Sequence, residues 1–223
     1  MTIQEAYVSF LMLVNRNATN NNQNVDKSRF ITMFRDMELR FYEFILKNRQ
    51  NDTIRDVANF LVPRQIVTLS QNEQKYNTYN LPENFFEFAN LHVKAKKDNC
   101  VDGLLTVEVK TEDVEEVLND QFSKPDFFSR ETVYHLSEDN KVAVYKGDFE
   151  IDKVELTYYR FPRQVDIAGY TRTDGTVSNQ DVDPEWDDKE INKILLYMAK
   201  DFSANNGDNK YQIEKDRLFE SLQ

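Results

Sequence analysis

Residues 154–217 decide the fold of this chain, and they read VELTYYRFPRQVDIAGYTRTDGTVSNQDVDPEWDDKEINKILLYMAKDFSANNGDNKYQIEKDR. At the start of this stretch Val154, Leu156 and Tyr158 alternate with other residues, so their side chains point to one side of the chain. Such a period of two predicts a half-buried β-strand. The strand is expected to end at Pro162, because proline has no amide hydrogen to donate to a neighbouring strand.

A loop and two helices are expected after this strand. The loop covers residues 164–184, is polar and acidic, and contains the turn pair Asp174-Gly175. A helix then starts near Glu185, and acidic residues gather in its first turn, where the helix dipole favours negative charge. Its apolar stripe has helical spacing and consists of Ile191, Ile194, Leu195, Met198 and Phe202. A second helix is expected over residues 211–222.

The N-terminal residues 1–62 also have a helical pattern. A first helix over residues 2–15 is predicted by the stripe of Ile3, Tyr7, Phe10 and Val14. After an asparagine-rich spacer, Asp26 offers an N-cap oxygen to a longer helix. The apolar positions of that helix include Phe30, Ile31, Phe34, Met37, Leu39, Phe41, Tyr42 and Phe44. A face this broad predicts packing on two sides, one of them a candidate subunit contact. A short helical segment is expected over 52–61.

Residues 63–163 change to a period of two after Pro63, which predicts β-strands. Leu105 and Val107 are expected on the buried face of one of them. A short helix opened by Thr111 is expected to follow. Strands are predicted over 91–95, 105–109, 132–136, 141–145 and 150–160, the last three as an antiparallel meander. Residues 66–88 and 123–130 place aromatic side chains in loop-like sequence.

These elements predict an α+β fold. N- and C-terminal helices are expected to pack as a bundle, with a mostly antiparallel β-sheet module inserted between them. The expected parts are the N-terminal helices (1–62), the β module (63–163), the acidic loop (164–184) and the C-terminal helices (185–223).

The composition fits a folded protein that is made in a reducing cytoplasm. Of the 223 residues 40% are hydrophobic, and no apolar run approaches the roughly 20 residues needed to span a bilayer. A single cysteine, Cys100, allows no internal disulfide. The net charge of −11 argues against a protein that grips nucleic acid phosphates, but it does not argue against a conduit through which DNA slides.

No catalytic signature is present in the sequence. It contains neither a phosphate-binding glycine-rich loop nor a Gly-x-Ser-x-Gly elbow, and its two histidines, His92 and His135, have no metal-ligand spacing. The basic run Lys94, Lys96 and Lys97 is interpreted as the wet face of a strand rather than as a DNA contact. We therefore expect no catalytic residue, no cofactor and no metal.

Two features near the last loop have alternative interpretations. The carboxylates of residues 181–188 could gather a hard cation, but Pro184 interrupts their spacing, so an acidic loop and a helix start are favoured. Trp186 could staple its helix to the core or anchor in a neighbouring subunit, and the sequence does not decide between the two.

The sequence resembles head-to-tail connector proteins of short-tailed bacteriophages, and most closely the ring proteins of crAss-like phages. The segments that carry the resemblance are TYYRFPRQVD, DPEWDDKEINKILLYMAKDF and NNGDNKYQIEKDRL, with a weaker similarity in YNLPENFFEFANLHVKAKK. They cover about the last third of the chain and part of its middle. None of them is a catalytic motif.

The resemblance implies a virion structural protein at the head-tail junction. It is expected to form a closed ring, a dodecamer, beneath the portal protein and above further ring or tail proteins, with double-stranded DNA passing through the lumen and no membrane contact. Subunit or partner contacts are expected at Trp186, Lys210, Tyr211, Lys215 and Arg217.

Two other functions are compatible with the same sequence. One is a soluble adaptor or assembly chaperone that acts as a monomer or small oligomer, because the same amphipathic helices would serve it. The other is a small metal-dependent hydrolase that uses the carboxylates of residues 181–188, and it is the least favoured.

Overall fold

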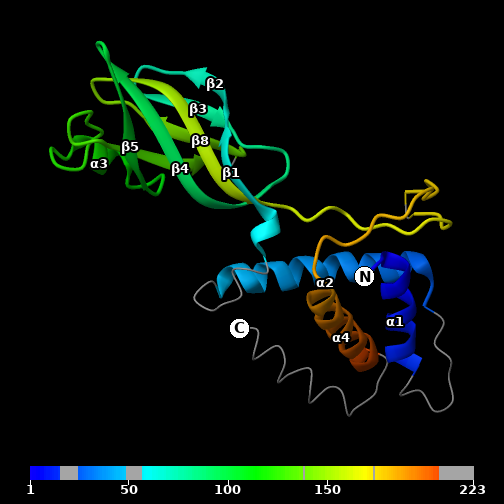
Figure 1. Cartoon of the computed structure of the whole chain (residues 1–223). Coiled ribbons are helices and arrows are strands. Elements are labelled where there is room, and N and C mark those ends of the chain that lie inside the picture. The colour runs from blue at the N-terminus through cyan, green and yellow to red at the C-terminus, as the bar shows by residue number, and fades with distance from the viewer. Residues whose placement is uncertain (16–24, 49–56, 138, 173, 206–223) are drawn as a thin grey trace. The chain divides into compact units, whose positions relative to one another are not determined.

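The chain has the α+β class that its sequence predicts: along the sequence, helices come first and last, and the strands of one large mixed sheet come between them (Figure 1). The computed structural model describes residues 1–15, 25–48, 57–137, 139–172 and 174–205. Two compact units divide the chain. The helical unit consists of residues 1–59 and 162–223, and the sheet unit consists of residues 60–161.

The N-terminal helices are α1 (Ile3–Asn15) and α2 (Lys27–Lys47). The predicted cap at Asp26 is confirmed, because its carboxylate accepts a hydrogen bond from the Arg29 amide at 2.7 Å. Periodicity also predicts most of the burial, and the buried apolar side chains of α2 are Phe30, Ile31, Phe34, Met37, Phe41, Tyr42, Ile45 and Leu46. Leu39, in contrast, is exposed. Of the predicted segment 52–61, residues 57–60 form a short 3₁₀ turn, and 52–56 lie outside the described residues.

Helix α4 (Asp188–Asn205) completes the described part of the helical unit. All five residues of its predicted apolar stripe are buried. The ring of Phe202 lies edge-on to Phe10 of α1, with centroids 6.0 Å apart, and Phe41 of α2 meets Trp186 in the same way at 5.5 Å. Helix α4 therefore packs against both N-terminal helices. The helix predicted over 211–222, and the spacer between α1 and α2, lie outside the described residues.

The predicted acidic loop is an arm, residues 163–182, that folds back on itself. Isolated antiparallel bridges join Asp166 to Val182 and Thr171 to Val177. The turn at its tip uses Gly175, whose φ of 83° is accessible to glycine without strain. Val165 and Ile167 at its base are fully buried, so the arm is attached to the helices.

The sheet unit contains eight strands and one short helix. The strands are β1 (Leu61–Ile66), β2 (Thr68–Asn72), β3 (Tyr76–Asn80), β4 (Phe85–Lys97), β5 (Cys100–Glu108), β6 (Glu131–Ser137), β7 (Lys141–Tyr145) and β8 (Glu150–Arg160). Their order in the sheet is β1-β8-β4-β5-β6-β7-β3-β2. Every neighbouring pair is antiparallel except β5 and β6, which are parallel. The helix α3 (Val114–Asn119) lies in the connection between these two strands.

One face of the sheet carries the main core of this unit. Strands that are far apart in the sheet order share a single cluster, in which Tyr79 of β3 and Val142 of β7 join Val93 of β4 and Leu156 of β8. A flat sheet could not bring these side chains together, so the sheet curls around them, as Figure 1 shows. A smaller cluster, with Val114 of α3 on Val133 of β6, covers part of the opposite, outer face.

The predicted orientation of β5 is wrong. Leu104 is buried, whereas Leu105 and Val107 point outward and are 64% and 45% exposed. Because Leu104 and Leu105 are adjacent, the sequence does not show which of them points into the core. A shift of one residue exchanges the two faces of a strand. The pairing of Leu104 with Val93 of β4, which is fully buried, fixes the parity.

The predicted meander is correct only for β6 and β7. Strand β8 does not pair with β7, but lies between β1 and β4. Strands β1 to β3 occupy much of the region that looked loop-like, and β3 takes the place beside β7. Pro63 lies inside β1, which is an edge strand with an irregular register, where a missing amide hydrogen is tolerated. Helix α3 begins after Asp113, whose side chain forms no capping hydrogen bond, rather than after Thr111.

Candidate interaction surfaces

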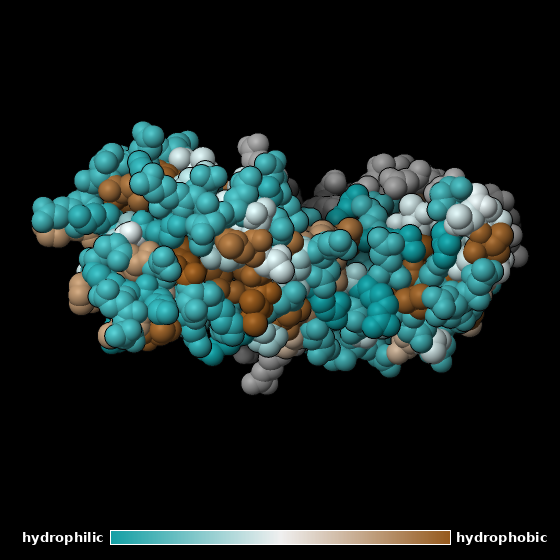
Figure 2. Space-filling model, turned by 90° about the horizontal axis from the view of Figure 1, so that it is seen from above, coloured by the Kyte–Doolittle hydropathy of each residue, from teal (hydrophilic) through white to brown (hydrophobic). Residues whose placement is uncertain are grey.

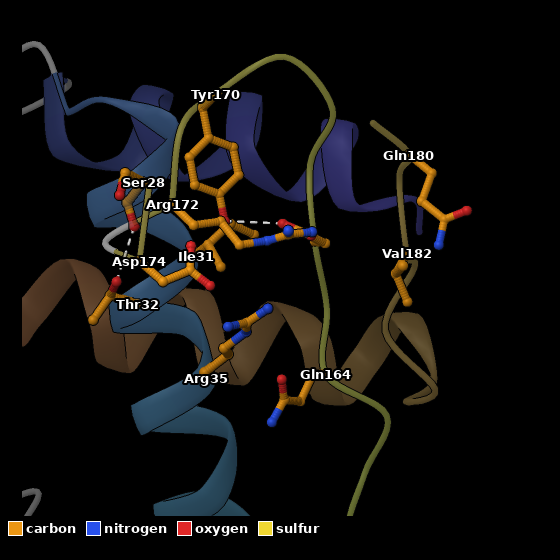
Figure 3. Close-up of a pocket in the computed structure, with 11 residues that line it drawn as sticks. Ser28, Ile31, Thr32, Arg35, Gln164, Tyr170, Arg172, Asp174, Gln180 and Val182 are labelled. Carbon is orange, nitrogen blue, oxygen red and sulfur yellow. Dashed lines mark hydrogen bonds and ion pairs between the residues drawn. The ribbon is translucent and has the colours of Figure 1, made fainter. Parts of the chain in front are cut away.

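A polar groove of about 470 Å³ lies between α2 and the arm of the helical unit (Figure 3). Ser28, Thr32 and Arg35 line it from α2, and Tyr170 and Arg172 line it from the arm. The guanidinium of Arg35 donates to the Val165 carbonyl through Nη2 and Nε, at 2.7 and 3.1 Å. This arginine therefore ties the arm to the helix.

The second arginine of the groove is neutralised within the arm. Arg172 forms an ion pair with Asp166, which also accepts a hydrogen bond from the Tyr170 hydroxyl at 2.9 Å. Burial raises the pKa of the Asp166 carboxyl, but the hydrogen bonds from Arg172, Tyr170 and the Ile167 amide outweigh it, so the pKa lies below its usual value. The charged and polar side chains of the groove therefore form an ion pair and hydrogen bonds that stabilise the folded arm.

The acidic residues that follow the arm hold the start of α1 in place. Asp183 accepts a hydrogen bond from the Ile3 amide at 2.8 Å, and Asp188 pairs with the amino group of Met1. Asp181 accepts one from the Ala168 amide at 2.7 Å. These carboxylates satisfy donors that a helix start and a turn leave open. Among the described residues, no three potential ligands are grouped to hold a metal ion.

Trp186 lies in the interior of the helical unit and is 5% exposed. Its ring is edge-on to Phe41 and Tyr42, and its indole Nε1 donates a hydrogen bond of 2.8 Å to the Glu38 carboxylate. These contacts are those of a staple between the start of α4 and α2. The sequence could not identify Glu38 as the partner, because it lies 148 residues away.

Glu38 is the buried acid of this core. Burial raises the pKa of its carboxyl to about 8, and the hydrogen bond from Trp186 only partly opposes this effect. The other expected contact residues, Lys210, Tyr211, Lys215 and Arg217, lie outside the described residues.

The sheet unit has an uncovered region on its outer face. We call the outer face of β5 and of the adjoining parts of β4 and β8, together with helix α3 at its border, the open face. Val101, Leu105 and Val107 of β5 form its apolar stripe, and all three are at least 45% exposed. Figure 2 shows one face of the molecule, on which hydrophobic patches lie among hydrophilic side chains. An exposed apolar stripe of this kind marks a possible contact surface.

Charged residues flank the apolar stripe on both sides. On the β4 side, Lys94 is in register with Gly103 and Lys96 with Val101, so both lysines share the face of the stripe. On the β6 side, α3 carries exposed Glu115 and Glu116 in its first turn. Two phenylalanines near the stripe, Phe122 and Phe128, are 89% and 79% exposed. The sequence analysis missed the stripe, although the Leu104-Leu105 doublet was a signal that both faces of β5 are apolar.

The two histidines lie on the outer face. His92 of β4 stands close to Gly103, where an added Cβ would come within 3.0 Å of its ring. His135 of β6 is hydrogen-bonded at Nδ1 to the Tyr145 hydroxyl at 3.2 Å, and burial lowers its pKa. Both rings are therefore in contact with neighbouring residues of the sheet unit.

Comparison of the sequence with protein-family models and with curated proteins finds no match. Within the described residues, no helix is both long enough and apolar enough to cross a membrane.

Proposed function

We propose that this protein is a virion structural protein that forms a closed ring, expected to be a dodecamer, between the portal and the tail of a bacteriophage. Double-stranded DNA would pass through the lumen without sequence-specific binding. Helices α1, α2 and α4, together with the helix expected over 211–222, would form a bundle into which the sheet unit is inserted. The resemblance of residues 154–217 to connector proteins suggests this function.

The observation that carries the proposal is exposed apolar surface on both units. On α1, Val8 and Met12 are 48% and 67% exposed, and on the sheet unit Ile66 of β1 and Leu69 of β2 are 59% and 51% exposed. In a cyclic ring each subunit offers two different patches to its identical neighbours. A contact between α1 of one subunit and the β1–β2 side of the next would cover both patches.

Reconstitution with the portal protein of the same phage tests the proposal. The wild-type protein should co-sediment with portal and show rings by negative-stain microscopy. A Val8→Ser/Met12→Ser variant should lose the rings, because it removes the apolar patch of α1. The control is Asp36→Ser/Arg40→Ser, which changes an exposed pair on α2 and should leave the rings intact.

Two results would contradict the proposal. If the wild-type protein neither binds portal nor forms rings, the connector function is wrong. If it binds a virion protein but remains a monomer or small oligomer in the complex, the adaptor or assembly-chaperone function is favoured instead.

A further inference from the structure

The open face of the sheet unit has three zones that follow the strand order. The apolar stripe on β5 is the middle zone, because β5 lies between β4 and β6. Lys94 and Lys96 of β4 form the basic zone on one side. Helix α3, which packs on Val133 of β6, brings Glu115 and Glu116 to the other side as the acidic zone.

The charges of the two outer zones are only partly compensated within the described part of the chain, because Lys94 acts electrostatically on Glu155 of β8 on the same face. Neither Lys94 nor Lys96 has an ion pair there, and the same is true of Glu115 and Glu116. A different basic residue of this face, Lys153 of β8, is already paired with Glu155 at 2.5 Å. Glu150 of β8 lies directly opposite Lys96 of β4 on the same face, so it compensates part of that charge without forming an ion pair. Lys94, Lys96 and Lys153 outnumber Glu150 and Glu155 on this side, so a small positive excess is available to a charged partner.

The acidic and basic sides of the open face also differ in height. On the acidic side, α3 stands on the sheet as an additional layer, because Val114 packs on Val133. On the basic side, Lys94 is half-buried and Lys96 is exposed, whereas farther along β8 the outward residues Glu155 and Tyr159 are buried. A raised acidic zone and a lower basic zone thus lie on opposite sides of an apolar stripe.

We infer that the open face pairs with the open face of a second copy of this chain around a two-fold axis. Such a rotation brings the raised acidic zone of each copy onto the basic zone of the other, and it brings the two apolar stripes together. An apolar centre with a charged rim is the usual composition of a protein interface. Phe122, at the end of α3, supplies an exposed aromatic side chain to each contact.

A second copy fits this face better than nucleic acid does. A duplex would meet the two lysines, but its phosphates would be repelled by Glu115 and Glu116 on the same face. A copy of the chain carries both charges in the complementary arrangement. The pairing goes beyond the proposed ring, because it describes the protein in the absence of portal.

Charge reversal tests this pairing in sedimentation velocity runs without portal. Wild-type protein should be a dimer at micromolar concentration. Lys94→Glu/Lys96→Glu and Glu115→Lys/Glu116→Lys should each weaken the dimer at least about tenfold, because like charges then face each other across the axis. Mixing these two variants should restore a heterodimer. The quadruple variant that combines all four changes should restore a homodimer.

A matched control is Lys47→Glu/Lys189→Glu, at two exposed lysines of the helical unit. It changes the net charge by the same amount as Lys94→Glu/Lys96→Glu and should leave the dimer intact. The restored dimers show that the variants fold. The inference is overturned if the wild-type protein is a monomer, if the single-zone variants remain dimers, or if neither the mixture nor the quadruple variant recovers. These runs contain no portal, so their failure is distinct from a failure of the ring reconstitution.

Discussion

In the helical unit the apolar faces of α1, α2 and α4 meet one another, whereas in the sheet unit only one face of the sheet is filled completely. Phe10, Phe34 and Ile194 are fully buried between helices. On the sheet, Leu156 is fully buried on the inner face and Leu105 is mostly exposed on the outer face. The same residue type therefore has a structural role on one face and is available for binding on the other.

The two units also use their charges differently. In the helical unit the acidic side chains have partners within the unit: Asp166 pairs with an arginine, Asp183 accepts from a backbone amide, and Asp188 pairs with the N-terminus. On the open face of the sheet, Lys96 and Glu116 have no such partners within the described residues. This difference places the candidate surface for pairing with a second copy on the sheet unit.

The largest effect is expected from the same substitution on the two faces of the sheet. Leu156→Ala should lower the free energy of unfolding by roughly 2–5 kcal/mol, because it leaves a cavity in the core. Leu105→Ala should change it by no more than about 0.5 kcal/mol. Urea unfolding at low protein concentration measures both values. Equal losses would show that the outer face is also a packed core.

The next effect concerns the pH dependence of the helical unit. The folded-state pKa of Glu38 is raised to about 8, so the folded protein favours the neutral carboxyl. Stability from this group is fully present below pH 4.5 and is lost as the pH rises to about 8, by an amount on the order of a few kcal/mol. Glu38→Gln should remove this loss, because the amide does not ionise.

The comparison is the difference in melting temperature between wild type and Glu38→Gln from pH 5 to pH 9. Glu43→Gln, at a more exposed position of the same helix, is the control and should follow the wild-type profile. A Glu38→Gln profile that is parallel to the wild type would show that this carboxyl does not change its charge on folding.

The smallest effect is expected at the start of α1. Asp183→Ala removes the acceptor of the Ile3 amide and should destabilise the helical unit by about 1 kcal/mol. Asp36→Ala removes only an exposed pair with Arg40 and should cost about 0.3–0.5 kcal/mol. Thermal unfolding at neutral pH ranks the two. If Asp183→Ala costs no more than Asp36→Ala, the contact between the arm and α1 contributes little.

Local sequence patterns predict the α+β class, the position and most of the buried face of the described long helices, and the cap at Asp26. They also locate β4, β6, β7 and β8. These features depend on residues close together along the chain: a period of 3.6 or 2, or a side chain three residues from the amide that it caps.

Only the tertiary structure decided which strands are neighbours, which face of β5 is buried, and that Trp186 meets Glu38. The strand β8 pairs with β4 rather than with the adjacent β7, and no local pattern encodes that choice. Leu105 is apolar and alternates with polar residues as a buried strand residue would, yet it is exposed because nothing in the described chain covers it. Periodicity defines two faces of an element, but burial depends on which distant segment covers each face.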